Sequence, residues 1–237
     1  MHPRVLIVIP AYNEENSIAA VIEGLRQAAP AYDRLVINDG AKDGTGKILS
    51  QMGEKQLLLP CNLGYGHALQ TGLKYGLQHG YDIIVSFDAD GQHRPEDVIM
   101  IVTALLENDV DVVIGSRYCR GEFYDSPLDR RVGQILFSKL TRLLIGQRIY
   151  DTTSGFKALR AAACEVIVSG IFMDFHTESL VRLSMAGFKI KEQLITVNER
   201  RHGRSMHSFV SIFTYPLQTL LLTVVAMVDA LLNRRKP

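Results

Sequence analysis

Short apolar runs alternate with amphipathic segments through the first half of the chain, and this alternation is what most constrains the fold. Runs of strand length occur at residues 4–10, 33–39, 55–60, 81–88 and 110–118. The segments between them carry apolar residues at helical spacing, as Ile18, Val21, Ile22 and Leu25 do. Strands separated by helices predict an α/β fold with a mostly parallel sheet, covered by helices on both faces.

The second half is less regular. Residues 128–146 predict a helix, 151–160 a loop and a short strand, 161–168 and 176–187 two further helices, and 189–199 a last strand. A basic run and then a long apolar stretch, residues 209–232, follow. We therefore expect one domain over residues 1–207 and an apolar C-terminal helix over residues 208–237. Near the N-terminus, Asn13 or Asn16 is expected to cap the first helix.

Charge and cysteine content exclude some classes of function. A formal net charge of +1 over 237 residues gives no general basic surface, so no nucleic-acid partner is expected. Cys61, Cys119 and Cys164 are scattered without metal-ligand spacing, which is typical of a reduced, cytoplasmic protein. The first apolar run is too short for a secretory signal.

Polar, acidic or glycine-rich residues follow each predicted strand of the first half. In parallel sheets, ligands bind beyond the carboxyl ends of the strands, where these residues would converge on one rim. The segments concerned are residues 10–14, 38–40, 62–66, 88–90 and 115–117. Their convergence is the main functional signal of the sequence.

Asp88 and Asp90 lie one residue apart where the fourth strand is expected to end. Within a strand they would point to opposite faces, but where the backbone turns both can reach one cation. Carboxylate oxygens suit Mg²⁺ or Mn²⁺, and Gln92 can add a carbonyl oxygen. The alternative is that both aspartates cap the next helix or lie in a solvated turn, but the neighbouring polar strand ends favour a metal site.

Other rim residues have the chemistry of a nucleotide site. Asp39 stands where an acceptor commonly contacts a ribose or base edge, although it can also be a turn aspartate before Gly40. Asn62 and Gly66 belong to a loop that would let the backbone approach a ligand closely. Guanidinium groups suit diphosphates, and the candidates are Arg117, Arg200, Arg201 and Arg204.

With these residues in place, the sequence resembles family 2 glycosyltransferases with the GT-A fold, close to the dolichol- or polyprenyl-phosphate sugar synthase branch. The matching motifs run in order from residue 8 to residue 206. They read "VIPAYNEE", "VINDGAKDGT", "NLGYGHALQTG", "FDADGQH", "VIGSRY", "DTTSGFKAL" and "RRHGRSM".

The resemblance implies a role for each matching residue. Glu178 falls where the family carries an acid facing the sugar or acceptor, and Asp90 and Glu178 are the catalytic candidates. Asp88, Asp90 and Gln92 would bind the divalent ion. The nucleotide-diphosphate sugar would be held by Pro10, Tyr12, Glu14, Asp39, Asn62, Gly66, Asp88, Ala89, Arg117, Arg201 and Arg204.

Three positions depart from the family pattern. Asn38 stands where many relatives have aspartate, so contact with the base would rest on Asp39. Met206 replaces a lysine that is frequent in the lipid-phosphate synthases, which weakens the prediction of that acceptor. His176 occupies a position that is often aspartate in that branch, which leaves Glu178 as the acid.

The resemblance predicts metal-dependent, inverting sugar transfer from a nucleotide-diphosphate sugar. The expected acceptor is a polyprenyl phosphate, which is anionic and needs no base, and the runner-up is a hydroxyl of a growing glycan, for which Glu178 would be the base. A sugar-phosphate nucleotidyltransferase would need a glycine-rich loop with Arg and Lys where "PAYNEEN" stands. A non-catalytic nucleotide-sugar-binding subunit of a membrane complex is disfavoured by the acidic pair.

The apolar stretch from Phe209 to Leu232 suggests a peripheral location at the inner, cytosolic face of the membrane. There the segment would lie in the membrane interface, with "NRRKP" contacting anionic lipid, or dock onto a small membrane protein. The alternatives are a core helix, a dimer helix in a homo-oligomer, and a membrane span, which Pro216, Gln218 and Asp229 disfavour.

Overall fold

The structure is a computed structural model, and it describes residues 3–118, 149–169 and 175–198. Three predicted features lie outside the described residues. These are the helix over residues 128–146, the arginines Arg200, Arg201 and Arg204, and the apolar segment 208–237.

Within the described part of the chain, seven strands form one sheet in the order β3-β2-β1-β4-β6-β5-β7. Neighbouring strands pair in parallel except β6, which is antiparallel to both β4 and β5. The predicted mostly parallel sheet is confirmed. The strands are β1 (Val5–Ala11), β2 (Asp33–Asn38), β3 (Gln56–Leu58), β4 (Ile83–Ser86), β5 (Val112–Ser116), β6 (Lys157–Arg160) and β7 (Ile190–Leu194).

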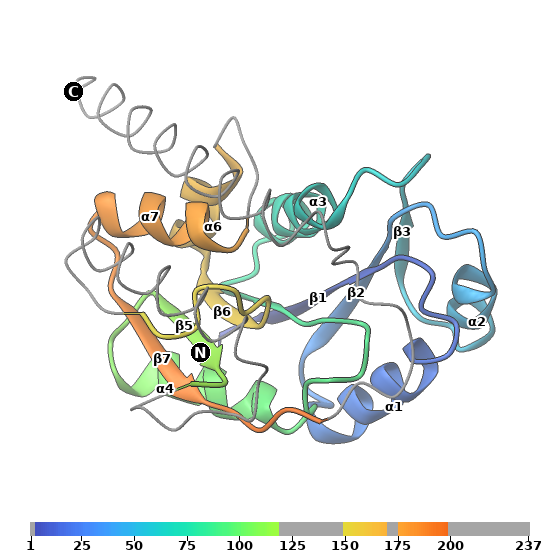
Figure 1. The fold of residues 1–237 in the computed structure, drawn as a ribbon, viewed down its shortest axis with the longest axis horizontal. Coiled ribbons are helices and arrows are strands. Elements are labelled where there is room, and N and C mark those ends of the chain that lie inside the picture. The colour runs from blue at the N-terminus through green and yellow to red at the C-terminus, as the bar shows by residue number, and fades with distance from the viewer. Residues whose placement is uncertain (1–2, 119–148, 170–174, 199–237) are drawn as a thin grey trace, which may run out of the picture.

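Helices cover both faces of the sheet, as Figure 1 shows. One face carries α1 (Ile18–Ala28), α2 (Thr45–Gln51) and α4 (Asp97–Glu107), and the other carries α3 (Tyr65–Gln78), α6 (Ala161–Val168) and α7 (Thr177–Met185). Each face has its own apolar cluster. In β1, Ile7 and Ile9 belong to the first cluster, whereas Leu6 and Val8 belong to the second. Because both faces are buried, the strand reads as a continuous apolar run.

Helix α3 lies unusually close to the sheet. A Cβ atom at Gly72 would lie 2.1 Å from Val8 Cγ1, and one at Gly76 would lie 2.4 Å from Ile84 Cδ1. Only glycine therefore fits at these two positions without a shift of the facing side chains, the helix or the strands. The two glycines thus allow α3 to pack directly against β1 and β4.

The helix cap predicted near the N-terminus is wrong. Helix α1 begins at Ile18 with Ser17 at the N-cap position, and the Ser17 hydroxyl donates to Glu14 Oε2 at 2.7 Å. Asn13 has a positive φ of 56°, a conformation that asparagine tolerates well. Its Oδ1 accepts a hydrogen bond from the Lys42 backbone N–H at 2.8 Å. Asn13 thus ties the loop after β1 to the loop after β2 instead of starting the helix.

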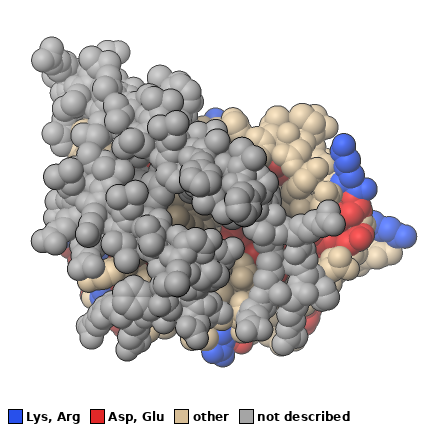
Figure 2. Space-filling view, in the orientation of Figure 1, with Lys and Arg blue, Asp and Glu red and all other residues tan. Residues whose placement is uncertain are grey.

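The described ranges contain no helix with the length and apolar character that crossing a bilayer requires. Figure 2 shows lysine and arginine side chains next to aspartate and glutamate side chains at the end of the molecule that carries α2. On the face shown there, charges of both signs are mixed at that end.

Candidate active site

The loops that follow β1 and β2 meet at one edge of the sheet, as predicted. The Asp39 backbone N–H donates to the Ala11 carbonyl at 2.9 Å, and the Glu14 N–H donates to Thr45 Oγ1 at 2.8 Å. Because β1, β2 and β4 run parallel, the turn after β4 lies at the same edge.

Asp39 holds the loop after β3 in place. Its Oδ1 accepts the Leu63 N–H at 2.8 Å and its Oδ2 accepts the Gly64 N–H at 2.9 Å, and the residue is 3% exposed. A Cβ atom at Gly40 would lie 2.5 Å from the Cys61 carbonyl carbon, so this loop also touches the backbone after β2. Both Asp39 oxygens are thus engaged within the protein. Contact between Asp39 and a nucleotide stays a prediction.

Several other predicted nucleotide contacts lie around this edge. Pro10 is buried near the end of β1, whereas the Tyr12 ring directly after that strand is 36% exposed. Glu14 is occupied by the Ser17 hydroxyl. Ala89 is buried between the two aspartates of the turn after β4. Asn62 lies in the loop that Asp39 holds, and Gly66 is the second residue of α3.

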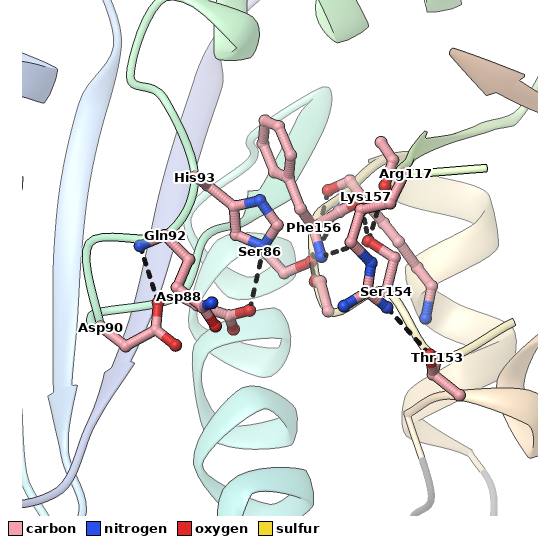
Figure 3. A network of polar contacts seen from close by, with 12 residues as sticks. Ser86, Asp88, Asp90, Gln92, His93, Arg117, Thr153, Ser154, Phe156 and Lys157 are labelled. Atoms are coloured by element: carbon pink, nitrogen blue, oxygen red, sulfur yellow. Dashed lines mark hydrogen bonds and ion pairs between the residues drawn. The ribbon is translucent and has the colours of Figure 1, made fainter. Parts of the chain in front are cut away.

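Asp88 is clamped by two side chains. Its Oδ1 accepts a hydrogen bond from the Tyr65 hydroxyl at 2.9 Å. Its Oδ2 lies 3.2 Å from His93 Nε2, a contact that Figure 3 shows. Burial alone would raise the pKa of Asp88, but the hydrogen bond and charge of His93 and the hydrogen bond from Tyr65 outweigh it and lower the pKa. Asp88 is therefore an anion at neutral pH, and the acceptor-only carboxylate requires His93 Nε2 to carry the proton.

Asp90 lies two residues further along the same turn. Its Oδ1 accepts the Gln92 backbone N–H at 3.0 Å, which Figure 3 shows, and the Gln92 carbonyl accepts the Asn198 N–H at 2.8 Å. Gly91 between them has a φ of +75°, which favours glycine. Strand β4 ends at Ser86, so both aspartates follow the strand instead of pointing to its opposite faces.

The donor atoms of this turn suit a hard divalent cation whose remaining coordination positions are filled by a substrate. No cluster of three or more His, Cys, Asp or Glu side chains with metal-site geometry occurs in the described part of the chain. Mg²⁺ is commonly bound through one or two carboxylates, with waters and substrate phosphates filling the other positions. Asp88 and Asp90 offer that donor set, because a carboxylate has about four lone-pair sites and the two hydrogen bonds on Asp88 leave others available.

Arg117 forms an ion pair that the sequence did not reveal. Its Nε donates to Asp151 Oδ2 and its Nη2 to Asp151 Oδ1, both at 2.8 Å. Nη2 also donates to Thr153 Oγ1 at 2.9 Å, a contact that Figure 3 shows. Asp151 is 1% exposed. Burial would raise the pKa of Asp151, but the Arg117 charge and hydrogen bonds hold it below its usual range. The structure therefore shows Arg117 fixed by a buried carboxylate, and its predicted phosphate contact is untested.

Glu178, the predicted acid, is enclosed in the protein. It lies in the first turn of α7, is 1% exposed, and its Oε1 accepts a hydrogen bond from Arg182 Nε at 2.7 Å. The two side chains form a buried ion pair one helical turn apart. A contact between Glu178 and a sugar or acceptor stays a prediction.

Comparison with known protein families matches residues 6–168 to the family described as glycosyl transferase family 2. The chain belongs to glycosyl transferase family 2. It is therefore an enzyme of the glycosyltransferase class, and the resemblance seen in the sequence motifs is confirmed.

Two relatives of this family 2 glycosyltransferase have names that include a lipid phosphate. The chain is 33% identical over 215 residues to an undecaprenyl-phosphate mannosyltransferase of Micrococcus luteus, covering 86% of this chain and 88% of that protein. It is 35% identical over 182 residues to a UDP-N-acetylglucosamine–dolichyl-phosphate N-acetylglucosaminyltransferase of Methanococcus voltae, covering 69% of this chain and 72% of that protein.

Solved structures establish the fold. Glucosyl-3-phosphoglycerate synthase from Mycobacterium tuberculosis, crystallised with Mn²⁺, UDP-glucose and phosphoglyceric acid, superposes with a TM-score of 0.71. The identity is 20%, and the match covers 94% of this chain and 79% of that one. This glycosyltransferase has the GT-A fold, as predicted.

The sequence did not point to the partners of Asp88 in this glycosyltransferase. Tyr65 is the first residue of α3, whereas His93 lies in the same segment after β4 as Asp88, and the contact of each with Asp88 depends on how the chain folds. Gly155 was also missed, although a Cβ atom there would lie 2.3 Å from the Tyr65 hydroxyl and 2.9 Å from Asp88 Oδ1. Gly155 precedes β6, and because this strand is antiparallel, residues ahead of it reach the site edge. The sequence did not indicate the antiparallel direction of β6, and therefore gave no sign that Gly155 lies at the site.

Proposed function

We propose that this glycosyltransferase is a metal-dependent, inverting enzyme that transfers a sugar from a nucleotide-diphosphate sugar to a polyprenyl phosphate at the cytosolic face of the membrane. The observation that carries the proposal is the turn after β4, where the carboxylates of Asp88 and Asp90 both lie at the edge that bears the loop held by Asp39. The names of the relatives support the donor and acceptor classes.

Different residues of the chain would bind different parts of the donor. The half-exposed ring of Tyr12 and the backbone of the loop held by Asp39 provide an apolar surface and close backbone approach for the nucleoside. Asp88 and Asp90 would hold Mg²⁺ or Mn²⁺ against the diphosphate. When bound, such a cation offsets the charge that develops on the departing nucleoside diphosphate.

The surroundings of Glu178 favour a phosphate acceptor over a hydroxyl. A phosphate oxygen is already anionic at neutral pH, so it attacks the anomeric carbon without losing a proton to a base. The new bond joins that oxygen to the anomeric carbon while the bond from this carbon to the diphosphate oxygen breaks, which inverts the centre and releases the nucleoside diphosphate. Glu178 is buried and paired with Arg182, an arrangement that suits a structural carboxylate better than a base exchanging protons with an acceptor.

A binding screen followed by a transfer assay tests the proposal. We expect one nucleoside diphosphate, from a panel with and without Mn²⁺, to raise the melting temperature in a Mn²⁺-dependent manner, because a ligand that binds only the folded state stabilises it. The corresponding sugar nucleotide should then glycosylate undecaprenyl phosphate but not undecaprenol. Equal transfer to undecaprenol, or transfer only to a glycan hydroxyl, would contradict the phosphate acceptor.

Asp90→Asn is the diagnostic variant, with Asp109→Asn as its matched control. Asp109 lies at the opposite edge of the sheet with a φ of +49°, which asparagine tolerates, and it pairs only with exposed Lys189 among the contacts described. We expect transfer to fall about 100-fold or more in Asp90→Asn, since a group that stabilises developing charge contributes on that order. Asp109→Asn should retain the wild-type rate. Full activity in Asp90→Asn would remove the basis of the proposal.

A further inference from the structure

We propose that Tyr65 is a positioning residue, whose hydroxyl fixes the orientation of the Asp88 carboxylate toward the cation and the donor diphosphate. The inference rests on the proposed function, because it assigns a task to Asp88 that only a donor complex requires. Tyr65 itself would not contact the reacting atoms. It would act through Asp88.

The geometry at Asp88 is that of a carboxylate held at both ends. Tyr65 donates to Oδ1 and His93 contacts Oδ2, at 2.9 and 3.2 Å. Two contacts on different oxygens define the plane of the carboxylate as well as its position. A single contact would leave the group free to rotate about the bond to Cβ. Loss of the Tyr65 hydroxyl therefore changes how well Asp88 is oriented.

The Tyr65 side chain is itself held rigidly. Its ring stacks on the His176 ring with a centroid separation of 5.6 Å and an interplanar angle of 7°, and it meets the Phe175 ring edge-on at 6.5 Å. The Phe175 carbonyl accepts a hydrogen bond at 2.6 Å from Nζ of the fully buried Lys157. The ring thus rests on the segment that leads into α7, which is anchored from β6.

The backbone of Tyr65 is fixed from the other side of the site. Tyr65 is the first residue of α3 and follows Gly64, which has a φ of +92°. The two preceding backbone N–H groups, of Leu63 and Gly64, both donate to Asp39. A short, continuous series of contacts therefore runs from Asp39, through the start of α3, to Asp88.

Gly155 leaves the space that the hydrogen bond between Tyr65 and Asp88 occupies. An added Cβ atom would lie 2.3 Å from the Tyr65 hydroxyl oxygen and 2.9 and 3.0 Å from the two Asp88 oxygens. Any larger residue at position 155 would have to displace the hydroxyl, the carboxylate or its own backbone. The segment before β6 thus encloses the hydrogen bond between Tyr65 and Asp88.

Tyr65→Phe tests the assignment because it removes the hydroxyl and keeps the ring that stacks on His176. We expect the dissociation constant for Mn²⁺, measured from the free-Mn²⁺ signal in electron paramagnetic resonance with a saturating nucleoside diphosphate, to rise about 10-fold. Groups that orient metal-binding side chains contribute about 10- to 100-fold to metal affinity. The measurement needs no turnover.

Tyr75→Phe is the matched control. Tyr75 lies in the same helix, its hydroxyl accepts a hydrogen bond from Lys55, and its ring stacks on His79, away from the turn after β4. The two variants should shift the ligand-free melting temperature to a similar extent, and only Tyr65→Phe should weaken Mn²⁺ binding. An equal loss of affinity in both would mark a general effect of disturbing α3 and overturn the assignment.

A double-variant cycle shows whether Tyr65 acts through Asp88. In an Asp88→Asn background, Tyr65→Phe should have little further effect on the Mn²⁺ dissociation constant, because the coupled partner is already altered. Gly155→Ala places a methyl group against the same hydroxyl and should weaken Mn²⁺ binding as Tyr65→Phe does. If Tyr65→Phe folds poorly, Gly155→Ala replaces it as the test variant.

The outcomes separate this inference from the proposed function. Wild-type protein that binds Mn²⁺ and a nucleoside diphosphate, together with unchanged affinity in Tyr65→Phe or in Gly155→Ala, overturns the role of Tyr65 and leaves the transferase proposal standing. Wild-type protein that binds no nucleoside diphosphate with Mn²⁺ overturns both.

Discussion

Individual carboxylates in this glycosyltransferase hold the protein together at the same edge where a donor would bind. Asp39 secures two backbone N–H groups, Asp88 secures Tyr65 and His93, and Asp151 secures Arg117. The sequence pointed to Asp39 and Asp88 because each follows an apolar strand. The backbone partners of Asp39 and the Tyr65 partner of Asp88 could not be predicted, since a contact between residues 23 to 25 positions apart in the chain leaves no local pattern. His93 is near Asp88 in the chain, but their contact depends on how the turn folds.

The buried pair of Arg117 and Asp151 leads to a prediction on stability. Asp151→Asn keeps the shape of the side chain but removes its charge, and leaves a mostly buried guanidinium without a counterion. We expect the free energy of unfolding, measured by urea denaturation at pH 7, to fall by about 3 kcal/mol, as it does when one member of a buried pair is removed. Asp109→Asn, which alters an exposed pair, should cause no measurable change. Wild-type stability in Asp151→Asn would show that the pair contributes nothing.

The same pair should be visible in the pH dependence of stability. The folded-state pKa of Asp151 is below its usual value, so the unfolded chain takes up the proton first as the pH falls. The stabilisation is therefore complete above the unfolded pKa of about 3.9 and is lost as the pH falls through the lower folded-state pKa. The difference in stability between wild type and Asp151→Asn should then narrow below about pH 4.

At the scale of helices and strands, the sequence predicted most elements because long apolar runs and helical spacing have clear periods. Every strand and helix predicted within the described ranges is present, with boundaries shifted by a few residues. Two features escaped the pattern. The direction of β6 is set by its pairing with β4 and β5, and Asn13 does not cap α1 because its side chain contacts the loop after β2, which leaves Ser17 at the N-cap position.

The close contact of α3 with the sheet gives the prediction at this scale. Replacing a glycine by alanine inside a helix normally stabilises it by up to about 1 kcal/mol. At Gly72 the new methyl group would lie 2.1 Å from Val8 Cγ1, so the sign should reverse. We expect Gly72→Ala to lower the free energy of unfolding by about 1–3 kcal/mol, the range for overpacked cores, in chemical denaturation.

The control for this variant is Lys74→Ala, at an exposed position of the same helix. It should leave the stability nearly unchanged, because alanine is at least as good a helix former as lysine. A stabilised Gly72→Ala protein would mean that α3 can move away from β1 at little cost.

At the scale of the whole molecule, the two ends of the parallel strands carry loops with different roles. Loops at the carboxyl ends of β1, β2 and β4 carry the candidate site, whereas the opposite edge carries turns such as the one at Asp109. The sequence predicted this division, since parallel strands place their carboxyl ends together. It could not predict how the second half closes the site, because β6 runs against its neighbours.

Hydrogen exchange should map this division. We expect a bound nucleoside diphosphate with Mn²⁺ to slow amide exchange in residues 11–17, 39–44, 61–66 and 87–93, since binding suppresses local opening there. Residues 29–32, 53–55, 79–82 and 108–111, at the opposite edge, should exchange at unchanged rates and are the internal control. Protection that is equal at both edges would contradict a site at the carboxyl ends.

The strand order has a consequence for biosynthesis. Strands β3, β2, β1 and β4 pair next to one another and are all complete by Ser86, whereas β6, β5 and β7 come later in the chain. Because proteins are made from the N-terminus at a limited speed, the early strands leave the ribosome first. We therefore expect the nascent chain to contain strands β1 to β4 and the loops that follow them before the segment bearing Gly155 has been translated.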